Sequence, residues 1–100
     1  NDPAMDVAPA GMPLEFSLSQ NYPNPFNPAT RIEYSIGKET KVKLEVFDLL
    51  GRSVVTLVDG PQHAGQHFVD FNASHLASGF YIYRLSSPDL TVAKKMMLVK

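Results

Sequence analysis

Residues 42–59, VKLEVFDLLGRSVVTLVD, decide the fold of this 100-residue chain. In the first half of the stretch apolar and charged residues alternate, and this period of two is typical of a strand with one buried face. The segment DLLG at 48–51 interrupts the alternation, and apolar residues resume after it. Because Gly51 can adopt the positive φ that a short hairpin loop usually requires, we predict two antiparallel strands joined here. A single hairpin is only marginally stable in water, so the rest of the chain must cover it.

The remaining sequence predicts further short strands and no helix. Turn residues recur about every 8–12 residues, which is typical of an antiparallel sandwich, and a loop is predicted at 59–65. The segment FYIYRLS, at 80–86, is apolar on both faces and therefore predicts a strand in the middle of a sheet. We predict an all-β fold, an immunoglobulin-like antiparallel β-sandwich of about seven strands in two sheets. Its strands outside the hairpin are expected at 14–18, 30–36, 66–72, 80–86 and 91–100.

A Leu-Gly-Tyr pattern supports the sandwich prediction. Leu76, Gly79 and Tyr81 precede or open the penultimate strand. In such sandwiches a tyrosine at this place closes a corner, because its hydroxyl bonds back to nearby backbone. We assign that role to Tyr81, with Tyr83 and Leu85 as neighbours on the same face.

The segment NYPNPFNP, at residues 21–28, holds three prolines that fix φ and remove three backbone donors. It therefore cannot form an interior strand or a helix. We interpret it as a rigid crossing from one sheet to the other, with Tyr22 and Phe26 anchored on the core. A recognition epitope is the alternative, and turn chemistry favours the structural interpretation.

Composition and charge limit the domain organisation and the partners. Residues 1–13 are rich in Pro and Ala and predict a flexible linker, so the folded domain is expected over 14–100. The chain lacks an initiator Met, and we interpret it as a piece of a longer protein. Ten acids against nine bases leave a net charge of −1, which argues against nucleic acid or an anionic membrane as the main partner. No apolar run is long enough for a transmembrane segment, and no signal peptide is recognisable.

Candidate chemistry is sparse. His63 and His67 are four residues apart, which separates them by about 13 Å in an extended chain, too far to share a metal ion. His75 has no Cys or carboxylate cluster beside it, and no nucleophile, phosphate-loop or paired-carboxylate motif is present. We therefore predict a module that is not an enzyme, with no catalytic residues, no metal and no cofactor.

The last seven residues contain Lys94, Lys95 and Lys100 and no acid, whereas residues 1–30 contain no Lys or Arg. A terminal edge strand often carries lysines that prevent edge-to-edge pairing. The alternative is a recognition element, in which a partner captures these lysines or adds a strand to the edge.

Four segments in this order resemble one family. They are NYPNPFNPATRIEYSI at 21–36, VKLEVFDLLGRSVVTLV at 42–58 with AGQHFVDF at 64–71, LASGFYIYRL at 76–85, and KKMMLVK at 94–100. Together they resemble the C-terminal sorting domains of the type IX (Por) secretion system of Bacteroidetes-like bacteria. The expected sandwich also resembles the immunoglobulin-like domain of flagellar hook-capping proteins.

The resemblance implies a secretion signal and a cell-surface attachment domain. It implies a passenger, such as a secreted enzyme, joined N-terminal to residue 1, and partners in the outer-membrane translocon and a cell-surface sortase that cuts in the linker. Localisation would be export through the periplasm to the outer cell surface or the extracellular medium. The positions that match the family motifs, and that the resemblance implies for recognition, are Pro23, Asn24, Pro25, Asp48, Gly51, Arg52, Gly79, Tyr81, Lys94, Lys95 and Lys100.

Two other functions fit a small sandwich. One is a carbohydrate-binding module, the other a passive accessory domain, either of them part of a secreted glycosidase. Sugar binding would require exposed aromatic side chains in a row, whereas the chain has no Trp and most Tyr and Phe occupy positions expected to be buried.

Overall fold

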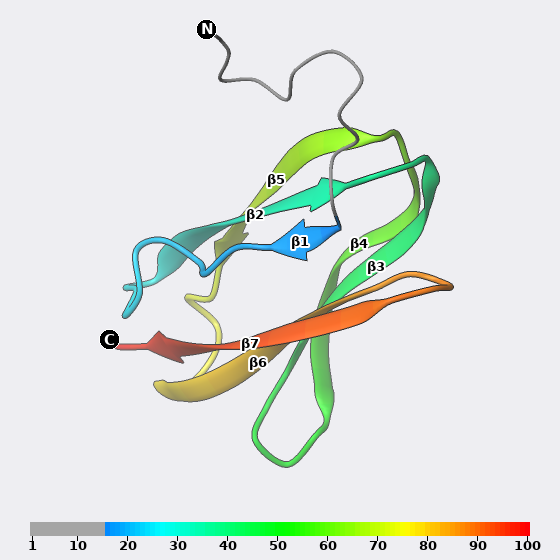
Figure 1. Ribbon diagram of the computed structural model, residues 1–100. Coiled ribbons are helices and arrows are strands. Elements are labelled where there is room, and N and C mark those ends of the chain that lie inside the picture. Colours follow the sequence, from blue (N-terminus) through cyan, green and yellow to red (C-terminus); the bar gives the residue numbers. More distant parts are fainter. Residues whose placement is uncertain (1–15) are drawn as a thin grey trace, which may run out of the picture.

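The computed structural model describes residues 16–100 as an all-β fold of seven strands in two sheets. Neighbouring strands pair antiparallel throughout. The three-stranded sheet has the order β1-β2-β5 and the four-stranded sheet the order β4-β3-β6-β7 (Figure 1). The predicted all-β sandwich is confirmed, whereas its immunoglobulin type remains a prediction. The strands are β1 (Ser17–Leu18), β2 (Ala29–Ile36), β3 (Thr40–Phe47), β4 (Ser53–Gln62), β5 (Gly65–Asn72), β6 (Gly79–Ser86) and β7 (Thr91–Leu98).

The hairpin predicted at 42–59 is confirmed as β3 and β4, but β4 is longer than expected. It continues through Gln62, so the loop predicted at 59–65 is wrong for its first half. Pro61 lies opposite Lys41 within the ladder. A proline is tolerated there because β4 is the edge of its sheet, where a missing donor need not break a ladder. Turn residues alone could not distinguish an edge strand from a loop.

The core lies between the two sheets and follows the period of two. Along β2, the inward residues Ile32, Tyr34 and Ile36 are buried and the alternating ones are not. β6 lies between β3 and β7, as predicted for a middle strand, and its inward residues Tyr83 and Leu85 are fully buried. The other buried apolar residues are Leu18, Phe26, Val42, Leu44, Val46, Phe71, Ala73, Tyr81, Met96 and Leu98.

The first predicted strand is present in part. β1 spans two residues and pairs with β2, and Phe16 before it packs against the core. Residues 14 and 15 of the strand predicted at 14–18 lie outside the described residues. The boundary between linker and domain therefore remains a prediction.

The proline segment differs from the prediction in two ways. It joins β1 to β2, which belong to the same sheet, so it does not cross between sheets. It nevertheless contacts the other sheet, because Phe26 forms a parallel bridge with Leu98. Phe26 is buried as predicted, but Tyr22 is 81% exposed and does not anchor the segment on the core. Tyr22 pairs with Arg31, an outward position of β2, and this pairing turns its side chain to the outer face.

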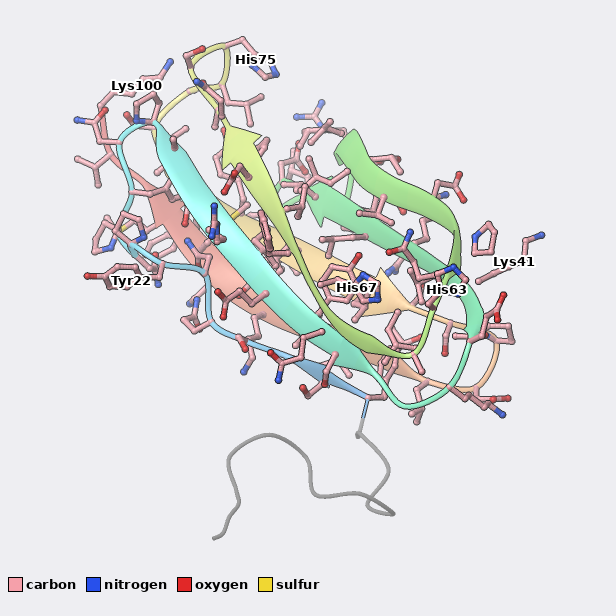
Figure 2. All side chains as sticks on the ribbon, turned by 90° about the horizontal axis from the view of Figure 1, so that it is seen from above. Tyr22, Lys41, His63, His67, His75 and Lys100 are labelled. Atoms are coloured by element: carbon pink, nitrogen blue, oxygen red, sulfur yellow. The ribbon has the colours of Figure 1, made fainter. Side chains whose placement is uncertain are left out.

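The strand registers place each loop or turn at one of two opposite ends of the sandwich. At the first, which we call the entry end, Phe16 lies beside the β2–β3 turn and the β6–β7 turn. At the opposite end, which we call the far end, Gly79 lies opposite Leu98 and the β3–β4 loop projects from the body (Figure 1). Figure 2 shows Lys100 and His75 at the far end and Lys41 and His63 toward the entry end. The far end comprises the residue ranges 21–28, 48–52, 73–78 and 99–100.

Candidate functional site

Most of the residues that match the family motifs lie at the far end, although they come from three separate segments. Pro23, Asn24 and Pro25 belong to the β1–β2 connection, and the peptide bonds before both prolines are cis. The hairpin loop supplies Asp48, Gly51 and Arg52, and the chain end supplies Lys100. Gly79, Tyr81, Lys94 and Lys95 lie on β6 and β7.

The proline segment holds the outer edge of β7 at the far end. The Phe26 amide donates to Met97 O at 2.9 Å, and the Val99 amide donates to Phe26 O at 2.9 Å. The Met97 amide donates to the Asn24 side chain, with 3.0 Å between N and Oδ1. Asn24 therefore contacts the final strand. Along this stretch the main-chain groups of the terminal edge are already paired, so strand addition would have to displace the proline segment or use the other half of β7.

A buried polar network, which the sequence did not predict, fixes the proline segment to both sheets. The Tyr83 hydroxyl donates to Ser19 O at 2.7 Å and accepts from the Asn21 amide at 2.8 Å. The Asn21 side chain, 2% exposed, donates to Thr30 Oγ1 and to Pro23 O. Burial raises the pKa of Tyr83 to about 12. The sequence signal for Asn21 is weak, because an Asn before an X-Pro run is usually an exposed turn residue.

The hairpin loop is organised around the Asp48 carboxylate. Its Oδ1 accepts from the amides of Leu50 and Arg52, and its Oδ2 accepts from Arg52 Nε at 2.8 Å. The hydrogen bond from the Arg52 amide, with smaller contributions from the other donors, holds the pKa of Asp48 below its usual value. Gly51 has φ 86°, a conformation that L side chains rarely adopt. The loop thus explains why Asp, Gly and Arg occur together, and it presents Leu49 and Leu50 to solvent, 60% and 79% exposed.

Gly79 and Tyr81 start β6 next to the core. The Tyr81 hydroxyl donates to Ala77 O at 2.6 Å, which confirms the predicted tyrosine corner. Gly79 has φ 147°, again in the region that favours glycine. Both residues therefore have a folding role.

The three terminal lysines point in different directions rather than forming a cluster. Lys94 lies on the inner face of β7, opposite Tyr83, and is half-buried. Lys95 lies on the outer face, with Nζ 4.9 Å from the ring centre of Phe80. Lys100 Nζ donates to Ser74 O at 2.6 Å in the β5–β6 connection. An inward-pointing lysine on an edge strand discourages pairing with another chain.

The three histidines do not come together. His63 and His67 lie toward the entry end, and His75 lies at the far end (Figure 2). His67 stacks on Tyr34 and its Nε2 lies 2.7 Å from His63 O, while His75 is exposed at the far end. Within residues 16–100 no three His, Cys, Asp or Glu side chains are placed to hold a metal ion. In the same part of the chain, no helix is long and apolar enough to cross a membrane.

Comparison with known families gives a match over most of the chain. The model of the family described as "Secretion system C-terminal sorting domain" matches residues 20–100, which include the proline segment, the hairpin loop and the terminal strand. A comparison with curated proteins finds no significant match. The match covers far more than half of the chain and begins just before the proline segment. The chain therefore belongs to the family of type IX secretion system C-terminal sorting domains.

Proposed function

We propose that this sorting domain directs a covalently attached passenger, such as a secreted enzyme, across the outer membrane and then serves its attachment to the cell surface. Family membership makes the domain a C-terminal, non-catalytic secretion signal. Passage through an outer-membrane translocon, cleavage by a surface sortase in residues 1–13, and retention at the surface are the parts that we propose.

The separation of the two ends is the observation that carries this proposal. Most of the family-motif residues lie at the far end, whereas the described chain begins at Phe16 at the entry end. A passenger joined before residue 1 would approach from the entry end and leave the far end accessible to a translocon. The same geometry would keep a cut in the linker away from the family-motif residues at the far end.

A fusion experiment tests the proposal. Residues 1–100 are attached to the C-terminus of a fluorescent protein that carries an inner-membrane export signal, in a host with the type IX pathway. We expect fluorescence at the surface or in the medium, and periplasmic fluorescence when the translocon is deleted. Periplasmic retention of a folded fusion in the intact host would refute the proposal.

The structure also decides which variants are informative in this assay. Removal of residues 94–100 would delete Met96 and Leu98, which are 1% exposed, so a loss of export would report unfolding as well as recognition. Replacement of Lys100 by Gln keeps the core intact and removes the contact with Ser74 O. It therefore separates capture of the terminal lysine from the stability of β7.

One structural feature supports the carbohydrate-binding alternative, and another argues against it. The outer face of the three-stranded sheet has a hollow of about 200 Å³ lined in part by Phe68, which is 58% exposed. However, the Arg31 guanidinium lies 4.0 Å above the Phe68 ring, so one ring face is already occupied. Micromolar binding to an insoluble polysaccharide, lost on Phe68→Ala, would favour this alternative over sorting.

A further inference from the structure

We propose that the outer face of the four-stranded sheet is the surface on which the secretion machinery docks, through Phe80 and Lys95, and that the docking partner is a protein surface with an apolar centre and acidic side chains around it. This inference rests on the proposed function and names the surface and the partner chemistry that the function requires. We call this surface the basic face. It comprises the outward residues of β3, β6 and β7, which include Lys41, Lys43, Phe80, Ile82, Arg84 and Lys95.

The sign of its charge distinguishes the basic face from the rest of the molecule. Its four cations are accompanied by Glu45 and, across the ladder on β4, by Asp59. The outer face of the opposite sheet instead carries one cation and two carboxylates, Arg31, Glu33 and Asp70. Since the whole chain has a net charge of −1, the basic face is a local reversal of sign. A complementary partner surface is therefore acidic.

Two of the cations are held over aromatic rings. Arg84 Cζ lies 4.5 Å from the ring centre of Phe47, and Lys95 Nζ lies 4.9 Å from that of Phe80. Such stacking restricts the side chains before any partner arrives, so less conformational entropy is lost on binding. Arg84 is also within 3.6 Å of Glu45, whereas in the described part of the chain Lys95 has no carboxylate partner. Of the two stacked cations, Lys95 is thus the one whose charge is available to a partner.

The opposite sheet has a similar pair of a phenylalanine and a stacked cation, but there the cation is paired with a carboxylate. Arg31 is also stacked on a phenylalanine, Phe68, but its guanidinium donates twice to Asp70, at 2.8 and 3.3 Å. That charge is neutralised within the sheet. The two faces therefore offer a matched comparison of an exposed Phe with a stacked cation, one of them free and the other paired.

The centre of the basic face is apolar. Ile82 lies opposite Phe47 on one side and Lys95 on the other, and Phe80 lies opposite Met97. Phe80 is 42% exposed on the sheet, away from the core. Aromatic residues, Met and Arg are the types enriched in protein interfaces. This combination favours a protein partner.

The size of the surface indicates a transient complex. Three strands of eight residues form a face about 26 Å long and about 14 Å wide. Its area of about 360 Å² is less than the roughly 800 Å² that each partner buries in a stable interface. A small interface with complementary charge associates quickly and dissociates quickly. Rapid release is what a sorting signal needs if one translocon is to serve many passengers.

Site-specific photo-crosslinking in the native host tests the inference. A photoreactive phenylalanine replaces Phe80 in the exported fusion, and in a matched control it replaces Phe68. We expect position 80 to crosslink to a protein of the type IX machinery and position 68 to give no such product. Lys95→Glu should lower the yield at position 80 about tenfold, because it introduces a like charge opposite the acidic partner. Lys38→Glu, the same charge change at the entry end, should leave the yield unchanged.

Export of simple variants provides the second measurement. Phe80→Ser and Lys95→Glu should retain the fusion in the periplasm although the domain remains folded, while Phe68→Ser and Lys38→Glu should be exported. If Phe80→Ser and Lys95→Glu are exported like the wild type, the inference is wrong and the sorting function stands. If the wild-type fusion itself is not exported, both are wrong. A crosslink from position 80 to lipopolysaccharide, to a second copy of the domain or to no pathway protein also overturns the inference.

Discussion

Replacing Tyr83 with Phe removes one hydroxyl from the buried network and should destabilise the domain strongly. The hydroxyl makes two hydrogen bonds, one to the Asn21 amide and one to Ser19 O. Tyr83 is 0% exposed and Asn21 is 2% exposed, so water cannot replace the hydroxyl at the Asn21 amide without rearrangement. The ring itself stays, so the core loses no apolar volume.

The expected loss follows from the two groups left behind. A buried donor without a partner costs about 1–3 kcal/mol, and this applies in full to the Asn21 amide. The Ser19 carbonyl belongs to an exposed residue and can bind water, so its loss adds about 1 kcal/mol or less. We expect the free energy of unfolding to fall by about 1–4 kcal/mol, which lowers the melting temperature by at least about 4 °C in a domain of this size.

Urea unfolding followed by far-ultraviolet circular dichroism measures this effect, with Tyr22→Phe as the matched control. Tyr22 is 81% exposed, and its hydroxyl has no hydrogen-bond partner among the described residues. Its replacement should change the free energy of unfolding by no more than about 0.5 kcal/mol. If Tyr83→Phe is as stable as Tyr22→Phe, the network does not hold the proline segment as we have argued.

Three further predictions concern the same end of the molecule. The pKa of Tyr83 is raised from 10.0 to about 12 in the folded state. The neutral hydroxyl therefore contributes fully to the free energy of unfolding below pH 10, and this contribution is lost as the pH rises from 10 toward 12, by about 1.4 kcal/mol per pH unit. Urea unfolding at several alkaline pH values should show this extra loss in the wild type and not in Tyr83→Phe. Asp48→Ala should increase hydrogen exchange at the amides of Leu50 and Arg52, because both amides donate to the Asp48 carboxylate. Since the pKa of Asp48 is lowered in the folded state, the stability that the carboxylate contributes should be present above pH 3.8 and disappear as the pH falls through its folded pKa. Equal exchange in Asp48→Ala and wild type at neutral pH would contradict this account. Phe26→Ala should lower the free energy of unfolding by about 3–5 kcal/mol because the ring is 1% exposed, whereas Phe68→Ala on the outer face should lower it much less. Similar melting temperatures for the two variants would show that Phe26 does not hold β7.

Local patterns were sufficient to predict the sandwich. The alternation along β3 predicted one buried face correctly, because one side chain in two meets the core in a strand that is solvated on its outer face. The tyrosine corner was predictable for a similar reason. Tyr81 and Ala77 are four residues apart, so the contact is set by local geometry.

Contacts between distant segments were not predictable in the same way. Asn21 and Tyr83 are 62 residues apart, and no pattern near either residue indicates that they meet. The same holds for Asn24 and Met97, 73 residues apart. The sequence correctly excluded an interior strand or a helix at residues 21–28, but where this segment packs depends on contacts with the second sheet. The terminal lysines appeared clustered in the sequence, and the alternation of β7 separates Lys94 from Lys95 onto opposite faces.

The placement of the two ends has a mechanical consequence. Under the proposed function, a passenger pulls on the domain from Phe16 at the entry end while the machinery holds the domain near the far end. The load then runs along the strands, parallel to the β1–β2 ladder and to its continuation at Ser19 and Tyr22. In that direction the hydrogen bonds between the strands are sheared together rather than opened one after another. The domain is therefore oriented to transmit traction to its passenger without unravelling from its first strand.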